Sequence, residues 1–347
     1  MKAVTFFDGT AWHEGTVDIV DGAIVLRGDA PRSGAPRLDG VITGGFTDHH
    51  VHLQLVDSSL LASSALGRVV DLGGNPAVIA DLAVDNSGRT RRGPRRGGSA
   101  GDFDGDVPEL STPARGHRIR VEYAGAFLTA PGGYPSDRSW APAASWREIA
   151  DPGEAAAAVA EMADAGASCI KVASNSTAGP VFGDELFRVI AGLAAARGLP
   201  VVAHAEGRGE AQRVARLGAR MLAHAPFTER LTDDEIEAQA ASLSWISTLA
   251  IHAAEELGIA TDNVRRFHAA GGIVRYGTDM GNGPTPVDVN PVEVTALRDA
   301  GIDGDALLRA LSPVDPREPG SQLLRFPPGS GADPLRGRPL TIADLEN

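Results

Sequence analysis

The sequence predicts an α/β protein, a (β/α)8 TIM barrel with a small β-sandwich domain built from the N-terminal segment and the C-terminal tail. Three observations predict it. Short strands with turn signals fill the N-terminus, helical and strand patterns alternate from about residue 150 onward, and eight barrel strands can be counted. A chain of 347 residues has room for one large barrel with an appendage.

The N-terminal segment is predicted to form a small β unit. Polar and apolar residues alternate over 1–42, and the Asp-Gly pairs at 8–9 and 21–22 are typical of hairpin turns. The tail carries a short apolar run at 340–345, which we expect to return and pair with these hairpins. The predicted domains are therefore 1–42 plus 320–347 for the small β domain and 43–319 for the barrel.

Eight strands and five helices are expected in the barrel. Strands that alternate with helices of 10–15 residues indicate βαβ units, a parallel sheet, and an active site at the C-terminal ends of the strands. The expected strands are 41–53, 65–74, 118–128, 168–174, 199–205, 219–225, 243–250 and 273–279. The expected helices are 153–167, 183–198, 209–218, 232–242 and 261–272.

A stretch at about 85–117 interrupts this alternation between the second and third strands. It is rich in Gly, Pro and Arg and has no hydrophobic period. We interpret it as a flexible insertion; the alternative is an Arg cluster that acts as a lid or as a docking surface for an acidic group.

Charge and composition exclude several classes of partner. The formal net charge of −13 argues against nucleic acid or an anionic membrane as the main partner. No run of about 18 apolar residues could span a bilayer. The single cysteine, Cys169, cannot form an internal disulfide, and Asp8 interrupts the N-terminus before a signal-peptide core can develop. We therefore expect a cytoplasmic protein; the sequence is compatible with a homo-oligomer.

Histidines and an aspartate fall at the ends of predicted strands. His50 and His52 are two residues apart, so their side chains leave one face of the first strand. His204, His224 and Asp279 each end another strand after an apolar run. On a barrel these ends converge, which predicts a metal site; the alternative is a set of buried core histidines and a helix-capping aspartate.

Lys171 is unusual in this chain, which has 30 Arg but only two Lys. It lies inside a predicted strand, where a buried ammonium group is costly unless it is paired or chemically changed. A desolvated amine can react with CO2 to form a carbamate, which an Arg side chain cannot do. Lys171 is therefore a candidate for an anionic bridge between two metal ions, with chance retention as the alternative.

The motif at 44–52, Gly-Gly-Phe-Thr-Asp-His-His-Val-His, resembles the opening motif of the amidohydrolase superfamily. The ordered series His50, His52, Lys171, His204, His224 and Asp279 is similar to the metal-site pattern of that superfamily. Segments at 69–74, 125–135, 166–172, 204–207 and 277–282 look most like its imidazolonepropionase-like and Xaa-Pro dipeptidase-like branch. Two positions depart from the branch: its Thr-Gly-Gly-His loop reads Pro-Gly-Gly-Tyr here, and Glu206 stands where many relatives have a second His.

This resemblance implies a metal-dependent amidohydrolase that cleaves a C–N bond of a small molecule: a cyclic amide, an N-acyl amino acid or a dipeptide. His50, His52 and Asp279 would bind one metal, and His204 and His224 the second. Carbamylated Lys171, which requires CO2, would bridge them. Zinc is expected first, with Mn or Fe also compatible. A metal-bridging hydroxide would attack the carbonyl, with Asp279 as general base and then general acid.

Substrate contacts are expected from three residues that follow barrel strands: Tyr134, His252 and Asn282. A deaminase of the same fold is an alternative, in which His50, His52, His204 and Asp279 hold one ion and His224 contacts the substrate. A lactone or phosphoester hydrolase and a non-catalytic binding protein are the further alternatives. Cys169, two residues before Lys171, is expected to be buried filler.

Overall fold

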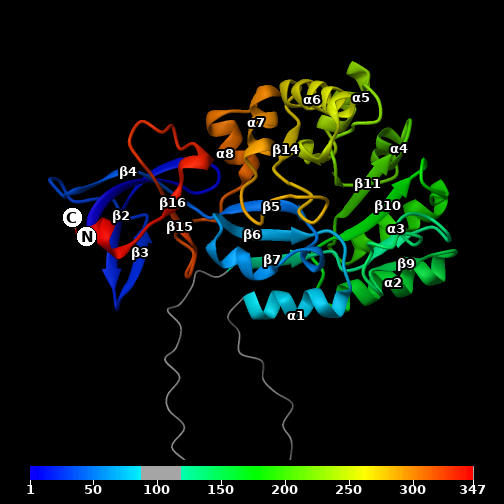
Figure 1. Cartoon of the computed structure of the whole chain (residues 1–347), viewed down its shortest axis with the longest axis horizontal. Helices are drawn as coiled ribbons and strands as arrows, with labels where there is room; N and C mark the ends of the chain where they lie inside the picture. The colour runs from blue at the N-terminus through cyan, green and yellow to red at the C-terminus, as the bar shows by residue number, and fades with distance from the viewer. Residues whose placement is uncertain (87–118, 347) are drawn as a thin grey trace, which may run out of the picture.

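The N- and C-terminal segments share one six-stranded sheet (Figure 1) in the computed structural model, which describes residues 1–86 and 119–346. The strand order is β16-β15-β4-β1-β2-β3. Both Asp21 (φ 50°) and Gly22 (φ 75°) have the positive φ that a tight hairpin turn requires between β2 and β3. The six strands are β1 (Lys2–Phe7), β2 (Trp12–Val20), β3 (Ala23–Arg27), β4 (Arg37–Gly44), β15 (Leu323–Phe326) and β16 (Arg338–Pro339).

The C-terminal tail joins this sheet differently from the prediction. The strand that pairs with β4 is β15, whereas most of the apolar run at 340–345 forms the short helix α9 (Ile342–Glu346). Asp344 favours this turn because it accepts hydrogen bonds from the backbone and hydroxyl of Thr341, both at 2.9 Å. Leu340 is buried in the core of the sheet. The domain limits at 42/43 and 319/320 stay a prediction.

A parallel barrel follows the small sheet. All strand pairs of the barrel are parallel, and a bridge between Val51 and Met280 joins its last segment to its first. The strands are β5 (Phe46–Val51), β6 (Leu66–Asp71), β7 (Arg120–Tyr123), β8 (Phe127–Thr129), β10 (Ile170–Asn175), β11 (Val201–Glu206), β12 (Met221–Leu222), β13 (Ser244–Ile246) and β14 (Ile273–Arg275). The added strand β9 (Trp146–Glu148) pairs with β8.

Two predicted strands are each divided in the structure. The segment 41–53 changes sheets after β4, where a Cβ on Gly45 would lie 2.6 Å from the backbone nitrogen of Gly67. The segment 118–128 is split into β7, which pairs with β6, and β8, which pairs with β10. Gly125 lies at this break with φ +78°, so the chain turns where an extended strand was expected.

Helices surround the barrel and precede or follow its strands (Figure 1). The sixth, α6, begins at Ala254, earlier than the predicted 261, because Glu255 and Glu256 suit a helical first turn. None of the helices in the described residues is long and apolar enough to cross a bilayer. The insertion predicted at about 85–117 lies outside the described residues from position 87 on. The helices are α1 (Pro76–Asn86), α2 (Pro152–Asp164), α3 (Asp184–Ala196), α4 (Glu210–Arg216), α5 (Asp233–Ala240), α6 (Ala254–Ala269), α7 (Pro291–Asp299) and α8 (Gly304–Leu311).

A layer of small and aliphatic side chains fills the barrel beneath the strand ends. It includes Cys169 and Val202, each two residues before a predicted ligand on the same strand face. Burial raises the pKa of the Cys169 thiol to about 12, as expected for a packing residue. This layer supports the polar side chains above it, and its full membership is Leu72, Ala124, Cys169, Val202, Ala223 and Ile246.

Candidate metal centre

The six predicted metal ligands all line one cavity of about 210 Å³ at the C-terminal ends of the barrel strands. Each side chain is buried, with exposed fractions between 1% for Lys171 and 8% for His204. The six are His50, His52, Lys171, His204, His224 and Asp279. The first two come from β5 and the segment directly after it, Lys171 lies on β10 and His204 on β11, and the other two follow β12 and β14.

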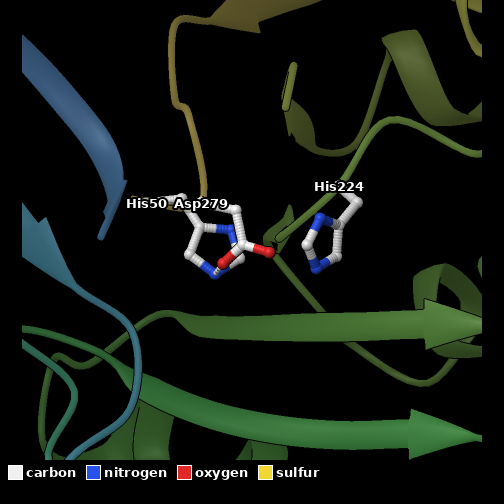
Figure 2. A group of neighbouring side chains, drawn as sticks. All are labelled: His50, His224 and Asp279. Carbon is white, nitrogen blue, oxygen red and sulfur yellow. Dashed lines mark ion pairs between the residues drawn. The ribbon is translucent and has the colours of Figure 1, made fainter. Parts of the chain in front are cut away.

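Asp279 lies at the centre of the tightest part of this group. Its Oδ1 atom is 3.2 Å from Nε2 of His50 and 3.2 Å from Nε2 of His52. Ligand atoms of His50, His224 and Asp279 all lie within 4.8 Å of one another. Figure 2 shows the Asp279 carboxylate between the imidazole rings of His50 and His224. This spacing would allow one metal ion to touch all three side chains.

The hydrogen bonds of the two first-strand histidines define which ring nitrogen faces Asp279. Nδ1 of His50 lies 2.8 Å from the carbonyl of Ala223, and Nδ1 of His52 lies 3.0 Å from the carbonyl of Gly73. A carbonyl only accepts, so each Nδ1 carries a proton and each ring turns its Nε2 toward the carboxylate; in neutral His50 this Nε2 bears a lone pair.

These facing lone pairs suit a bound cation. Nε2 of His50 and Oδ1 of Asp279 are buried and have no hydrogen-bond partner among the described residues. Burial lowers the pKa of His50 well below its ordinary value, whereas Asp279 raises the pKa of His52 despite burial. The metal-free group thus holds too few protons for its acceptors. A divalent ion ligated by two imidazoles and a carboxylate would satisfy them, so the residues fit a metal.

Backbone contacts fix the two strands that carry this group. Buried Asp48 accepts hydrogen bonds from the backbone of His50 at 3.0 Å and of Thr278 at 3.1 Å, so it joins the first strand to the segment after β14. Asp279 itself has φ 53°, a left-handed conformation that Asp tolerates better than most residues. Asn282 donates to its Oδ2 at 2.9 Å. The carboxylate is therefore held from both sides.

His224 and His204 form the opposite part of the group. Nδ1 of His224 lies 2.9 Å from Oγ1 of Thr248, which leaves Nε2 for the centre. Nε2 of His204 lies 3.0 Å from Oε2 of Glu206, which leaves Nδ1. Their ring centroids are 4.8 Å apart. Each imidazole is thus oriented through one nitrogen by a neighbouring side chain, the arrangement that metal-binding histidines usually have.

Lys171 lies in the same cavity with its Nζ 5.8 Å from the centroid of the Phe127 ring. It has no carboxylate within ion-pair distance among the described residues. Burial lowers the pKa of its amine to about 8, so a substantial neutral fraction exists near neutral pH. A neutral amine is the form that reacts with CO2.

The three predicted substrate contacts also line the cavity: Tyr134, His252 and Asn282. Tyr134 stacks on the ring of His204, with centroids 5.2 Å apart. Nε2 of His252 is buried without a hydrogen-bond partner in the described part of the chain. The sequence did not identify Phe127, Trp140, Phe227 and Ile251 as lining residues, and Glu206 was noticed only as a departure from the family motif.

Comparisons with known proteins agree with the fold. No family model matches the chain, and no curated protein matches it significantly. Solved structures do. A Xaa-Pro dipeptidase with bound methionine has a TM-score of 0.65 at 18% identity, covering 99% of this chain and 96% of its own. Ochratoxinase from A. niger has a TM-score of 0.66 at 15% identity, with coverages of 97% and 94%.

Phenylurea hydrolase B has a TM-score of 0.68 at 16% identity, covering 98% of this chain and 94% of its own. A dihydroorotase and an amidohydrolase also match. The chain therefore shares its fold, a (β/α)8 barrel with a small β domain, with these solved hydrolases along nearly its whole length.

Proposed function

We propose that this protein is a metal-dependent hydrolase that cleaves a C–N bond of a small molecule. One observation carries the proposal: two buried imidazoles place their Nε2 atoms 3.2 Å from one carboxylate oxygen in a cavity. Without a cation this cluster would leave buried polar atoms unsatisfied, which is costly. The enzymes with the same fold act on such bonds, as their names dipeptidase and phenylurea hydrolase indicate.

Two metal positions are proposed. His50, His52 and Asp279 would hold one ion, His204 and His224 the other, and carbamylated Lys171 would link them. Imidazole and carboxylate ligands suit zinc, and Mn or Fe are compatible with the same donors. When bound, the metal supplies Lewis acidity, which polarises a carbonyl group and lowers the pKa of a water molecule.

Side chains of the protein transfer the proton and bind the substrate. Asp279 accepts a proton from the attacking water and returns it to the leaving nitrogen, so it serves as general base and then general acid. Asn282 keeps Oδ2 of Asp279 in place through the 2.9 Å hydrogen bond. Tyr134, His252 and Asn282 contact the bound substrate. The aromatic side chains exclude water from the reacting bond.

The substrate is small. A cavity of about 210 Å³ is smaller than the roughly 300–1,000 Å³ of most ligand pockets. A cyclic amide, an N-acyl amino acid, a dipeptide or another compact amide fits this size. A long peptide does not fit inside it, and we propose a cytoplasmic enzyme of small-molecule metabolism.

A single-metal deaminase is the second candidate. It is favoured by the 3.2 Å contacts of His50 and His52 with Oδ1 of Asp279, which one ion could satisfy while His224 contacts the substrate. In that case one metal per chain would be sufficient. A lactone hydrolase, another alternative, would use the same hydrolytic chemistry as the proposed amidohydrolase and the same arrangement of metal ligands.

Metal analysis joined to a substrate screen tests the proposal. The purified chain is stripped with a chelator, reloaded with Zn or Mn, and assayed against amides, ureas, lactones and aminopurines. We expect about two metals per chain and hydrolysis of an amide or urea only after reloading. One tightly bound metal with release of ammonia would support the deaminase. Ligand binding without any turnover, unchanged in Asp279→Asn, would support a non-catalytic binding protein.

A further inference from the structure

The walls of the cavity carry very little positive charge. Among the described residues that line it, Lys171 is the only Lys or Arg, and the proposed function uses it as a metal bridge. Arg138 is near, with its guanidinium carbon 5.7 Å from the Tyr134 ring centroid, but it pairs with Asp137 at 3.2 Å and does not line the cavity. The described residues that line the cavity therefore offer no free Lys or Arg side chain to pair with a substrate carboxylate.

Glu206 gives the same cavity a negative group next to the metal ligands. Its side chain lines the cavity and is 27% exposed, and one of its two carboxylate oxygens contacts neighbouring side chains. Oε2 accepts from Nδ2 of Asn175 at 2.7 Å and contacts Nε2 of His204 at 3.0 Å. These two contacts occupy Oε2 and hold the carboxylate in the cavity wall.

The second oxygen of Glu206 lacks a committed donor. Oγ1 of Thr177 lies 3.1 Å from Oε1, but it lies closer to Oδ1 of Asn175, at 2.7 Å. A hydroxyl has a single proton, and the shorter contact is the better hydrogen bond. Oε1 is therefore left with acceptor capacity in a partly exposed position on the cavity wall, where a ligand N–H could reach it.

Aromatic rings make up much of the remaining wall. Trp140 has ring centroids 6.4 Å from Phe127 and 6.1 Å from Tyr134, and Phe227 lies 4.3 Å from His252. Rings of this kind bind planar apolar groups and the faces of cations. A carboxylate set among aromatic rings selects a positively charged or N–H-donating group on an otherwise apolar ligand.

We propose that this cavity selects small aromatic or planar amides that carry an amine or another N–H donor and no carboxylate. Glu206 is the residue that binds this N–H donor. The inference rests on the proposed C–N hydrolase function and narrows its substrate class. It disfavours N-acyl amino acids and dipeptides, which present a free carboxylate. Glu206 would thus determine specificity, in addition to orienting His204.

Three amides that share the acetanilide core and differ in one substituent test this selection. They are acetanilide, 3-(aminomethyl)acetanilide and 3-acetamidobenzoate, each assayed with the metal-loaded enzyme. We expect kcat/KM to be highest for the amine and lowest for the carboxylate, with about tenfold between the extremes, as a charge-assisted hydrogen bond provides. In Glu206→Gln the ratio of kcat/KM for the amine to kcat/KM for acetanilide should fall about tenfold, whatever loss the two amides share through the altered contact with His204. Glu229→Gln removes a negative charge outside the cavity lining and should leave all three rates unchanged.

Several results would overturn the inference. Preference for the carboxylate would do so, as would an equal change for all three amides in Glu206→Gln. Loss of metal from Glu206→Gln to the extent seen in His204→Ala would make Glu206 a part of the metal site instead. If none of the amides is hydrolysed, titration calorimetry on the wild-type protein measures their binding. The same order of affinity would uphold the selection without turnover, and no binding would overturn the selection. The hydrolase function itself is decided by the separate screen of amides, ureas, lactones and aminopurines.

Discussion

The two parts of the candidate metal centre differ in how closely their side chains are arranged for binding a metal ion. On one side, His50, His52 and Asp279 face each other with contacts of 3.2 Å and incomplete hydrogen bonding. On the other side, Lys171 has its amine over an aromatic ring, and His204 is bonded to Glu206. Under the proposed function, the first part needs only a cation to be complete, whereas the second also needs carbamylation of Lys171. Substitutions can therefore separate the two.

The largest effect is expected at Asp279, which belongs to the first part and is also the proposed proton carrier. In Asp279→Asn the side chain keeps its shape but loses its charge and its basicity, so kcat/KM should fall by about a thousandfold. Steady-state kinetics on the metal-loaded variant measures this. Asp299→Asn, an exposed position at the end of α7, is the matched control and should keep full activity. Activity above a tenth of wild type would remove Asp279 from the mechanism.

Substitution of Lys171 tests the second part alone. Lys171→Ala should lower the metal content from about two ions per chain to about one and reduce activity by about a hundredfold, because no bridge can form. Lys171→Arg keeps the positive charge without a carbamate and should show the same loss. Mass spectrometry of the metal content reads the result directly. Full activity of Lys171→Ala with one ion would establish the single-metal alternative.

Thr248 connects a barrel loop to His224 through the 2.9 Å contact between Oγ1 and Nδ1. Thr248→Val keeps the shape and removes this partner, so metal affinity should fall by about tenfold, the lower end for an outer hydrogen-bond partner of a ligand. Competition with a coloured chelator measures the affinity. Thr295→Val, on the exposed side of α7, is the control. Unchanged affinity would show that His224 is not a ligand.

A smaller effect is expected from pH in the metal-free protein. Burial lowers the pKa of Lys171 to about 8, and only the neutral amine reacts with CO2. Carbamylation at constant dissolved CO2 should therefore rise several-fold from pH 7 to pH 9, with its midpoint near 8. Carbon-13 NMR with labelled CO2 detects the carbamate. No labelled signal in wild type, or the same signal in Lys171→Ala, would contradict the assignment.

Much of this site could be predicted from the sequence because strand ends in a barrel converge. His204, His224 and Asp279 each follow an apolar run, so their meeting place follows from topology alone. Glu206 could have been placed in the cavity too, since it lies two residues after His204 on the same face of β11. Its role is visible only when its hydrogen bonds are known.

Other features depend on contacts that no local pattern contains. Trp140 and Phe227 lie in loops without a period, and their approach to the histidines is set by packing. The break between β7 and β8 arises where Gly125 packs against Met162. The two residues are 37 positions apart in the sequence, so local propensity does not reveal this contact. The tail was predicted to be a strand, but the hydrogen bonds of Asp344 favour α9.

The most direct test of the metal centre is anomalous X-ray diffraction from crystals of the zinc-loaded, active protein. We expect a strong anomalous peak within bonding distance of Nε2 of His50 and His52 and of Asp279, and a second peak beside His204 and His224. The same data would show whether extra density extends from Nζ of Lys171. An active, zinc-dependent protein with no anomalous peak beside His50 and Asp279 would contradict the account.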